Sequence, residues 1–544
     1  MLIFLSLLLT VLASPPSAAD APIVDLGYAA YQGVGLPAGV TQFLGLRYAA
    51  PPLGERRFRA PADPPRSSTI QDASRFRPIC VGVSQTVSDS QAEDCLFINV
   101  FTPSNATSKS RLPVWLYIQG GGYAADANAN FNGTAVIQQA GFEMVFVNFN
   151  YRTGALGFLA SEQVRQHGDL NVGLLDQRKA LRWVQQYIKM FGGDPSHVVI
   201  HGASAGAGSV AHHLVAYGGR DDGLFVGAVA QSPFWPTQRT VAEMQFQYDR
   251  FVNDTGCAIG EKVKEDDDKK TLECLRGLDI ATIQAANVPS PFPGARSTTS
   301  SPLPTWYFLP VIDGDLIPDD LYRLFDTGRF LSVPLMVGSD TDEGSTFASD
   351  ASTPDEVSSF LQTNYPHLTD PQLKEINTAY PLLLPALPAH RAYFPSLSAA
   401  YGDATFTCPA LEIATALAAR QTSPVWTYRY NVLSPLNQAA GLGVPHMFET
   451  AAIFGPGFAG PADPSYSTLN SAIVPVTMAY WVSFILTLDP NPLRSAGAPV
   501  WPRSERNLTS RLRLQTNASV MEAVPNQLTE KCTMWRRMAG VMEV

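Results

Sequence analysis

Short, nearly continuous runs of apolar residues recur along the chain and predict buried strands. They are rich in β-branched and aromatic side chains, as expected of strands that are covered on both faces. The runs are Leu112–Gln119, Met144–Tyr151, His197–His201, Leu224–Ala230 and Val333–Val337. Between them, Leu174–Phe191 places apolar side chains on one helical face, and Gly402–Gln421 and Leu469–Thr487 predict later helices. Strands that alternate with helices indicate a mostly parallel sheet with helices on both sides.

Two stretches depart from this alternation and are expected to lie outside the core. Glu261–Lys270 is a run of charged residues and predicts a solvated surface loop. Asn287–Thr305 is rich in proline and serine and predicts a flexible loop. Neither stretch is a linker that divides the chain, so we expect residues 20–544 to form one large α/β domain.

Composition and charge exclude some classes of protein. The chain has 544 residues, 45% of them apolar, which is enough for a large core. Its formal net charge of −10 disfavours nucleic acid as a partner, because a polyanion is bound by a basic surface. The sequence has no cysteine and histidine cluster with zinc spacing, so no metal site is expected.

The first residues predict a secretory leader. Leu2–Ala13 is mostly apolar but too short to span a membrane, which takes about 20 residues. The small residues Ser17-Ala18-Ala19 follow and suit cleavage by signal peptidase. We therefore expect a signal peptide at 1–19, a secreted, extracellular protein and no stable membrane anchor. The oligomeric state stays open.

Six cysteines and five glycosylation sequons fit the secretory route. An even number of cysteines in a secreted chain predicts disulfides, and six cysteines allow 15 connectivities. The first two and the middle two lie close in sequence and would close short loops, leaving the last two to pair. The cysteines are Cys80, Cys95, Cys257, Cys274, Cys408 and Cys532. The sequons begin at Asn105, Asn132, Asn253, Asn507 and Asn517.

Gly202-Ala203-Ser204-Ala205-Gly206 is a candidate nucleophile motif. It follows a predicted strand and opens a helical segment, which is the context that a G-x-S-x-G elbow needs. The glycines permit a sharp turn that exposes the Ser204 hydroxyl at the end of the sheet. The alternative is a turn of small residues whose serine only caps the helix.

A serine hydroxyl needs a base, and the base needs an orienting acid. In proteins that use such a G-x-S-x-G elbow, the acid and then the histidine follow the serine along the chain. His212 and His213 lie on the next helix, so the candidate bases are His367, His390 and His446. His446 lies in a loop that could present it. The strand Val333–Val337 leads into three candidate acids, which the pattern does not separate: Asp340, Asp342 and Glu343.

Consecutive glycines after a predicted strand indicate an oxyanion hole. Gln119-Gly120-Gly121-Gly122 follows the strand that ends near Ile118. Backbone N–H groups must point at the negative oxygen of an acyl-transfer intermediate, and glycines let the chain turn them there. The expected donors are the N–H groups of Gly121, Gly122 and Ala205.

With these residues in view, the sequence resembles type B carboxylesterases, the group that includes cholinesterases and fungal lipases. Phe191–Gly206 is similar to the family's nucleophile signature, and Glu93–Val100 to its second signature. Similar framework segments run from Val40–Gly45 to Pro490–Pro492, so the resemblance covers nearly the whole mature chain. Within this family, the sequence is most similar in character to secreted fungal esterases.

The resemblance implies an α/β-hydrolase fold, with Glu343 as the acid and His446 as the base. It also implies that Glu449 is a structural acid and that Ser232 supports the catalytic acid. The implied disulfides are Cys80–Cys95, Cys257–Cys274 and Cys408–Cys532.

The sequence departs from its better-known relatives in the Cys80–Cys95 loop. The 14 intervening residues contain no tryptophan, whereas cholinesterases carry their choline-binding tryptophan there. Fungal lipases carry a lid in the same loop, and 14 residues leave little room for an amphipathic lid helix. The sequence therefore favours an esterase with an open pocket. We expect Phe234, Trp235 and the loop 287–305 to line that pocket.

The function that follows is hydrolysis of a small-molecule or lipid carboxylic ester by a Ser-Glu-His triad, without a cofactor. Three alternatives remain: a long-chain triacylglycerol lipase, a serine acyltransferase, and a catalytically silent adhesion module on the same fold. Relatives of the silent kind lose a member of the triad, and here Ser204, Glu343 and His446 are all present.

Overall fold

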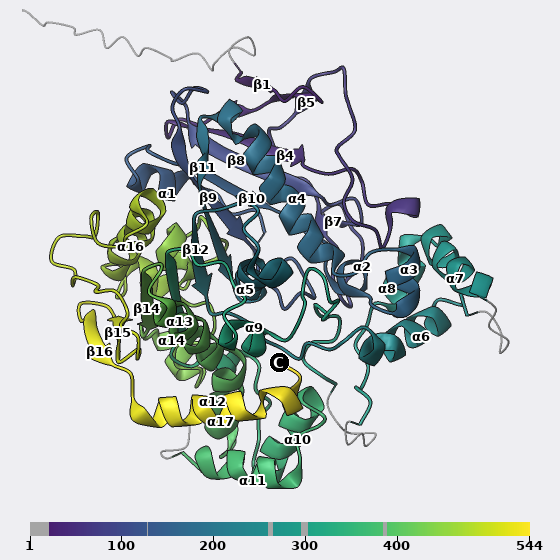
Figure 1. The fold of residues 1–544 in the computed structure, drawn as a ribbon. Helices are drawn as coiled ribbons and strands as arrows, with labels where there is room; N and C mark the ends of the chain where they lie inside the picture. Colours follow the sequence, from purple (N-terminus) through teal and green to yellow (C-terminus); the bar gives the residue numbers. More distant parts are fainter. Residues whose placement is uncertain (1–20, 128, 259–264, 295–302, 384–388) are drawn as a thin grey trace, which may run out of the picture.

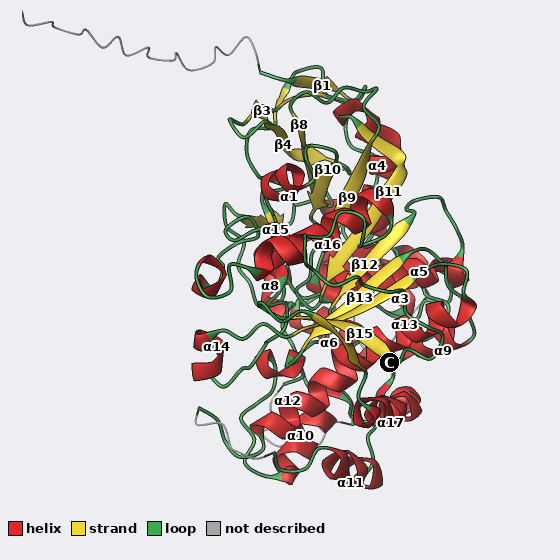
Figure 2. Ribbon diagram, turned by 90° about the vertical axis from the view of Figure 1, so that its left-hand side faces the viewer, coloured by secondary structure: helices red, strands yellow, loops and turns green. Residues whose placement is uncertain are grey.

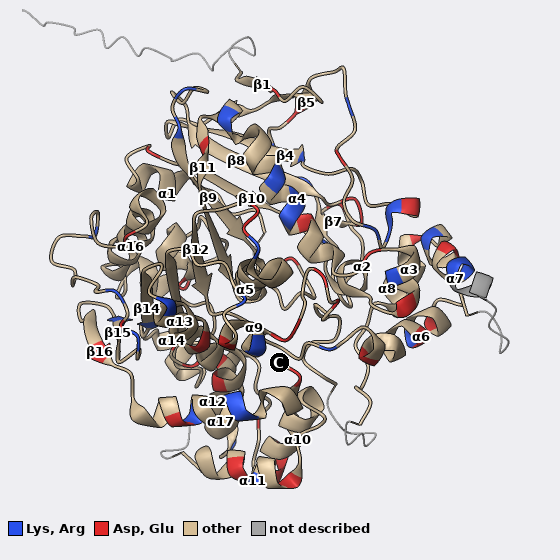
Figure 3. Ribbon diagram, in the orientation of Figure 1, with Lys and Arg blue, Asp and Glu red and all other residues tan. Residues whose placement is uncertain are grey.

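A large, twisted sheet forms the centre of the molecule and carries helices on both of its faces (Figures 1 and 2). The computed structural model describes residues 21–544 apart from 128, 259–264, 295–302 and 384–388. The expected signal peptide at 1–19 therefore lies outside the described residues. Acidic and basic residues are interspersed along the outer helices (Figure 3).

Among the described residues, the central sheet has eleven strands in the order β16-β15-β14-β13-β12-β11-β9-β10-β8-β4-β3. The seven strands from β15 to β10 run parallel, and antiparallel strands complete both sides. The strands are β3 (Val34–Gly35), β4 (Val40–Arg47), β8 (Phe97–Pro103), β9 (Leu112–Ile118), β10 (Val145–Phe149), β11 (Gly193–Ala203), β12 (Gly227–Gln231), β13 (Leu335–Asp340), β14 (Val425–Tyr430), β15 (Ser510–Leu514) and β16 (Val520–Ala523).

Two hydrophobic cores lie on opposite faces of this sheet. In β9, Leu116 and its alternate neighbours join one core, whereas Trp115 and Tyr117 join the other. The first core is covered by α4 (Val172–Tyr187), α5 (Ala205–Gly219) and α13 (Cys408–Arg420). The second is covered by α1 (Thr134–Gln139), α15 (Thr450–Phe454) and α16 (Ile473–Thr487). Burial on both faces explains why the strands read as continuous apolar runs.

The remaining helices extend from the two ends of this layered body (Figure 1). Helices α10, α11, α12 and α17 lie below the sheet in that view, and α6, α7 and α8 lie to its right. Their bounds, with those of the short helices, are α2 (Gly154–Phe158), α3 (Glu162–His167), α6 (Gln245–Asp254), α7 (Glu265–Gly277), α8 (Ile280–Ala286), α9 (Leu321–Asp326), α10 (Pro354–Asn364), α11 (Asp370–Ala379), α12 (Phe394–Gly402), α14 (Pro435–Ala439) and α17 (Asn526–Met542). Two small sheets are separate from the large one: β1 (Ile23–Asp25), β2 (Ala30–Gln32) and β5 (Gln71–Asp72) form the first, and β6 (Ile79–Cys80) and β7 (Gln91–Ala92) form the second.

The structure corrects three of the predicted elements. The charged run Glu261–Lys270 was expected to be a loop, but its described part belongs to α7, where Lys269 and Glu273 form an ion pair one turn apart. The helix predicted at Gly402–Gln421 is α13, which continues α12 through a π-helical turn at Asp403–Thr407. The strand predicted from Leu224 begins only at Gly227.

Candidate active site

Ser204 occupies the sharp turn between β11 and α5. Its φ of 58° is a left-handed backbone conformation, which typically costs about 1–3 kcal/mol for a residue other than glycine. The turn is held because the Ser204 N–H donates to the carbonyl of Gln231 at 2.9 Å. A methyl group on Gly202 would lie 2.0 Å from the carbonyl oxygen of Gly206, and one on Gly206 would lie 2.0 Å from that of Ile118. Only glycine fits at these two places.

The glycine loop after β9 packs directly on the nucleophile. A methyl group on Gly120 would lie 2.8 Å from the Cβ of Ser204. Gly121 and Gly122 have φ of +109° and +62°, so both need the freedom of glycine. Their N–H groups donate no hydrogen bond within the described part of the chain. Ala205 is the first residue of α5, where N–H groups have no helical partner.

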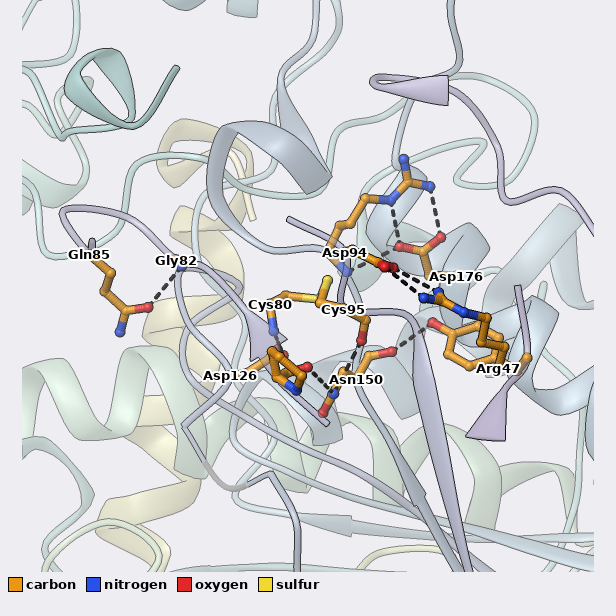
Figure 4. Close-up of a disulfide and its surroundings, with 12 residues drawn as sticks. Arg47, Cys80, Gly82, Gln85, Asp94, Cys95, Asp126, Asn150 and Asp176 are labelled. Carbon is orange, nitrogen blue, oxygen red and sulfur yellow. Dashed lines mark hydrogen bonds and ion pairs between the residues drawn. A yellow bond between two sulfur atoms is a disulfide. The ribbon is translucent and has the colours of Figure 1, made fainter. Parts of the chain in front are cut away.

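The disulfide Cys80–Cys95 lies beside Asp126, in the segment that follows the glycine loop (Figure 4). The carboxylate of Asp126 accepts the N–H of Cys80 at 2.8 Å, and the N–H of Val83 donates to the carbonyl of Ala124 at 2.7 Å. Burial raises the pKa of Asp126 well above its usual range. Residues 81–94, all of which the structure describes, form no helix between the two cysteines.

Glu343 is the acid that contacts His446. It follows β13, is buried, and contacts Nδ1 of His446 through Oε2. Its Oε1 accepts the N–H of Asp340 at 2.7 Å. The other two candidate acids face backbone instead: Asp342 accepts the N–H of Val444 at 2.8 Å, and Asp340 that of Phe448 at 3.2 Å.

His446 lies on the loop between α14 and α15, with its ring packed against aromatic side chains. The ring centroids of Phe406 and Phe347 lie 4.3 and 5.1 Å from that of His446. Its Nε2 is buried and makes no hydrogen bond to the described residues, so this atom is available to another group. Phe406 also stacks on Phe234, whose N–H donates to the carbonyl of Ser204 at 3.3 Å. The aromatic cluster thus joins the histidine to the nucleophile turn.

The other histidines after Ser204 are held elsewhere. His213 bonds to Gln177 at 2.9 Å, and burial lowers its pKa well below the usual range. Burial lowers the pKa of the neighbouring His212 to about 3. His390 stacks on Phe394, and His367 pairs with Glu543.

Trp306 and His201 were not singled out from the sequence, and nothing in the sequence paired Asp340, a candidate acid, with Glu449, the structural acid that the resemblance implied. Trp306 lies over the oxyanion loop, since a methyl group on Gly122 would lie 1.8 Å from its ring. Asp340 and Glu449 are buried together beneath the Glu343–His446 pair. His201 accepts the N–H of Trp115 at 3.2 Å and bonds to Gln231 at 3.2 Å on its other nitrogen. A polar residue inside an apolar strand is the only sequence signal for the last of these.

Other expected residues lie as follows. Ser232 is fully buried and its N–H donates to Gly338, but its hydroxyl has no hydrogen-bond partner among the described residues. Of the guessed pocket residues, Phe234 joins the aromatic cluster, whereas Trp235 is fully buried and stacks on Phe325. Part of the loop 287–305, the segment 295–302, lies outside the described residues.

The six cysteines pair as the resemblance implied. Besides Cys80–Cys95, the bonds are Cys257–Cys274, which joins the segment after α6 to α7, and Cys408–Cys532, which joins α13 to α17. Four sequon asparagines are exposed, and Asn132 is half-buried with its side chain accepting the N–H of Thr134. The exposed four are Asn105, Asn253, Asn507 and Asn517.

A serine on a strand-to-helix elbow, a carboxylate–histidine pair and unpaired glycine amides meet at the carboxyl edge of one parallel sheet. This arrangement defines the class of serine hydrolases built on an α/β sheet. The sequence profile described as the Carboxylesterase family matches residues 20–535, and the chain therefore belongs to that family.

Three known proteins show how close the similarity is. The chain is 59% identical to the protein in the crystal structure of Aspergillus niger EstA, with a TM-score of 0.93 over 97% of this chain and 100% of that one. It is 29% identical to Secreted lipase 4 of Gibberella zeae over 92% of this chain and 89% of that protein. It is 32% identical to Lipase 2 of Geotrichum candidum over 84% of this chain and 85% of that protein.

The fold is therefore the α/β-hydrolase fold, and the protein is a carboxylic ester hydrolase. Within the part of the chain that the structure describes, no helix is both long and apolar enough to cross a bilayer.

Proposed function

We propose that the protein is a secreted esterase that cleaves carboxylic esters through a covalent acyl-enzyme on Ser204. His446 Nε2 takes the proton of the Ser204 hydroxyl as the oxygen attacks the ester carbonyl. Glu343 holds the histidine in the required tautomer and stabilises the imidazolium that forms. The carbonyl oxygen becomes an anion, which the N–H groups of Gly121, Gly122 and Ala205 receive.

Collapse of this intermediate breaks the bond to the alcohol, and His446 gives its proton to the leaving oxygen. Water then enters, loses a proton to His446 and attacks the acyl-enzyme. The second collapse releases the acid and returns the proton to Ser204. Every proton that leaves a nucleophile thus passes through the same nitrogen, and the cycle regenerates the enzyme.

One observation carries this proposal: Glu343 contacts Nδ1 of a histidine whose Nε2 is buried and unpaired among the described residues. The other buried histidines lack this combination: His201 and His213 bond to glutamine side chains, and His212, which also has an unpaired nitrogen, contacts no carboxylate of the described residues. In His446, Nδ1 is held by a carboxylate and Nε2 is unpaired. This arrangement suits a histidine that accepts a proton on Nε2 during the reaction.

We propose short acyl chains as the preferred substrates. The indole of Trp306 lies over Gly122 and donates to the hydroxyl of Tyr401 at 3.1 Å, which fixes its position. Phe234 and Phe347 pack edge-on against this indole, with ring centroids at 5.2 and 5.7 Å. An aromatic wall this close to the oxyanion loop leaves little length for an acyl group. The absence of a helix in residues 81–94 also argues against a lid of the lipase type.

Secretion is supported by the apolar leader, three disulfides and relatives that are named secreted lipases. We propose that the signal peptide spans 1–19, that residues 20–544 act as one domain, and that the exposed sequons carry glycans.

Hydrolysis of p-nitrophenyl esters from acetate to palmitate, by wild type and Ser204→Ala, tests the proposal. We expect activity on short chains and a loss of at least about 10³-fold in the variant. Activity confined to long chains above their solubility limit would favour a lipase. No hydrolysis, but acyl transfer to an added alcohol, would favour an acyltransferase. Undiminished activity of Ser204→Ala would refute the mechanism.

A further inference from the structure

Two buried carboxyl groups face each other directly beneath the Glu343–His446 pair. Asp340 ends β13, and Glu449 lies at the start of α15, three residues after His446. The side chains are 1% and 0% exposed, and the N–H of Phe448, the residue before Glu449, donates to the Asp340 carboxyl group at 3.2 Å and holds it beside Glu449. They therefore connect the loop that holds the acid to the loop that holds the base.

The hydrogen bonds of the pair show which oxygens meet. Oδ2 of Asp340 accepts the N–H of Phe448, and Oε1 of Glu449 accepts the hydroxyl of Tyr428 at 3.2 Å. The remaining oxygens, Oδ1 of Asp340 and Oε2 of Glu449, are buried and have no other partner among the described residues. A carboxylate has no hydrogen to donate, so a bond between these two requires a proton on one of them.

The surroundings of the pair do not neutralise two charges. No lysine or arginine of the described chain forms an ion pair with either group. The titratable groups that face the pair are Glu343, His446, Tyr117, Tyr428, Tyr430 and Tyr466. Two carboxylates in contact inside a protein cannot both ionise, and one then keeps its proton. Burial raises the pKa of both groups.

The position of each group indicates which one holds the proton. Glu343 raises the pKa of both carboxyl groups, and of the two residues it is Asp340 that is bonded to Glu343, through its backbone N–H. Glu449 lies beside His446, whose imidazolium favours a neighbouring negative charge. The neutral acid is therefore expected next to Glu343, and the carboxylate next to His446.

We propose that Asp340 is a protonated positioning residue, which donates a hydrogen bond to the Glu449 carboxylate and holds that anion behind His446. The inference rests on the proposed function, since it assigns a role relative to the Ser204–His446–Glu343 triad. With the shared proton on Asp340, two buried carboxylates, Glu343 and Glu449, remain. Both stabilise the imidazolium that forms when Ser204 attacks. The shared proton also cross-links the two loops whose spacing sets the Glu343–His446 contact.

Isosteric amides test where the proton is. Asn at position 340 donates the same hydrogen bond as a protonated acid, so Asp340→Asn should keep kcat/KM within about threefold and leave its pH profile unchanged. Glu449→Gln removes the anion, so kcat should fall by at least about tenfold while KM changes little. The acidic limb of its kcat/KM profile should move down by about one pH unit, because a nearby negative charge favours the imidazolium. Glu412→Gln, at a buried acid remote from the site, is the matched control for loss of a carboxyl group and should behave as wild type.

The reverse pattern, a damaged Asp340→Asn and an intact Glu449→Gln, would place the proton on Glu449 and overturn the assignment. Equal losses in both variants with unshifted pH profiles would reduce the pair to ordinary packing and also overturn it. Ser204→Ala is measured in parallel. If Ser204→Ala is inactive while both amides match wild type, only this inference fails; if Ser204→Ala stays active, the proposed function fails.

Discussion

The two halves of the active site are held together by different forces. The half with Ser204 and Gly120–Gly122 is fixed by backbone geometry, because any added methyl group would overlap a carbonyl or a ring. The half with Glu343 and His446 is fixed by buried side chains that contact one another through charge and hydrogen bonds. The first half should therefore be sensitive to added atoms, and the second to an altered charge.

The difference also explains the support that each half has. The glycine loop is held by backbone hydrogen bonds, from the N–H groups of Ala124 and Ala125 to the carbonyl of Gly121, and these do not depend on side-chain protonation. The acid–base half depends on Asp340 and Glu449, whose hydrogen bond exists only while one proton remains. The geometry of the glycine loop thus depends on steric fit, whereas the geometry of the acid–base half depends on a protonation state.

The largest expected effect comes from the charge-dependent half. Glu343→Gln keeps the shape but removes the anion, and the amide can select the wrong histidine tautomer. We expect kcat to fall by about 10⁴-fold, as when the acid of a serine triad is made neutral. The neighbouring Asp342→Asn is the control and should retain most activity, because its oxygen accepts only a backbone N–H. Steady-state kinetics would contradict the comparison if the two variants were equal.

An added methyl group tests the shape-dependent half. Gly122→Ala would place Cβ 1.8 Å from the Trp306 ring, so the loop must shift and its amide must leave the oxyanion. A loss of about 10²- to 10³-fold in kcat/KM is expected, the usual cost of one oxyanion donor. Trp306→Ala in the same chain should recover part of this loss by making room. Failure of the double variant to improve on Gly122→Ala would mean that a clash is not the cause.

A smaller effect is expected from Trp306→Ala alone. Removing the indole lengthens the space above Gly122, so the ratio of kcat/KM for octanoate to that for acetate should rise by about tenfold. That ratio is obtained from p-nitrophenyl ester hydrolysis at several chain lengths. Tyr401→Phe, which removes only the hydroxyl that accepts the indole N–H, is the milder companion. An unchanged ratio in Trp306→Ala would show that the wall lies elsewhere.

The smallest effect should come from a half-buried carboxyl group outside both halves. Burial raises the pKa of Asp403 to about 6, with its Tyr380 hydrogen bond opposing the shift. The fold therefore favours the protonated acid, and this contribution to stability is lost as pH rises from about 4 through 6. The difference in free energy of unfolding between Asp403→Asn and wild type should be about 1–2 kcal/mol more favourable to the variant at pH 8 than at pH 4. Thermal unfolding at both pH values measures it, and ester hydrolysis should not change.

The shape-dependent half could be predicted from the sequence, because its signals are local. Gly202, Ser204 and Gly206 lie within five consecutive residues of one turn, and Gly120–Gly122 follow a strand by one residue. The acid could not be chosen by pattern, since Asp340, Asp342 and Glu343 lie within four positions and point to different partners. Which side chain meets His446 depends on a loop about 100 residues later in the chain.

The missed strands have a similar explanation. Strand β8 is fully buried, but Asn99 and Thr102 interrupt its apolar run. Both are satisfied inside the core, Asn99 by Asn148 at 2.7 Å and Thr102 by the carbonyl of Phe191 at 2.7 Å. A pattern of apolar positions does not register polar groups whose partners come from other strands.

The contact between Trp306 and Gly122 has a consequence for engineering and for evolution. Trp306, the residue proposed to limit acyl length, also packs on Gly122, a proposed oxyanion donor, so under this proposal selectivity and rate depend on one steric contact. A change that admits a bulkier substrate also loosens the amide that stabilises its transition state. A single substitution that broadens the substrate range is therefore expected to give an enzyme with a lower kcat. A second, compensating substitution near the loop would be needed to restore the rate.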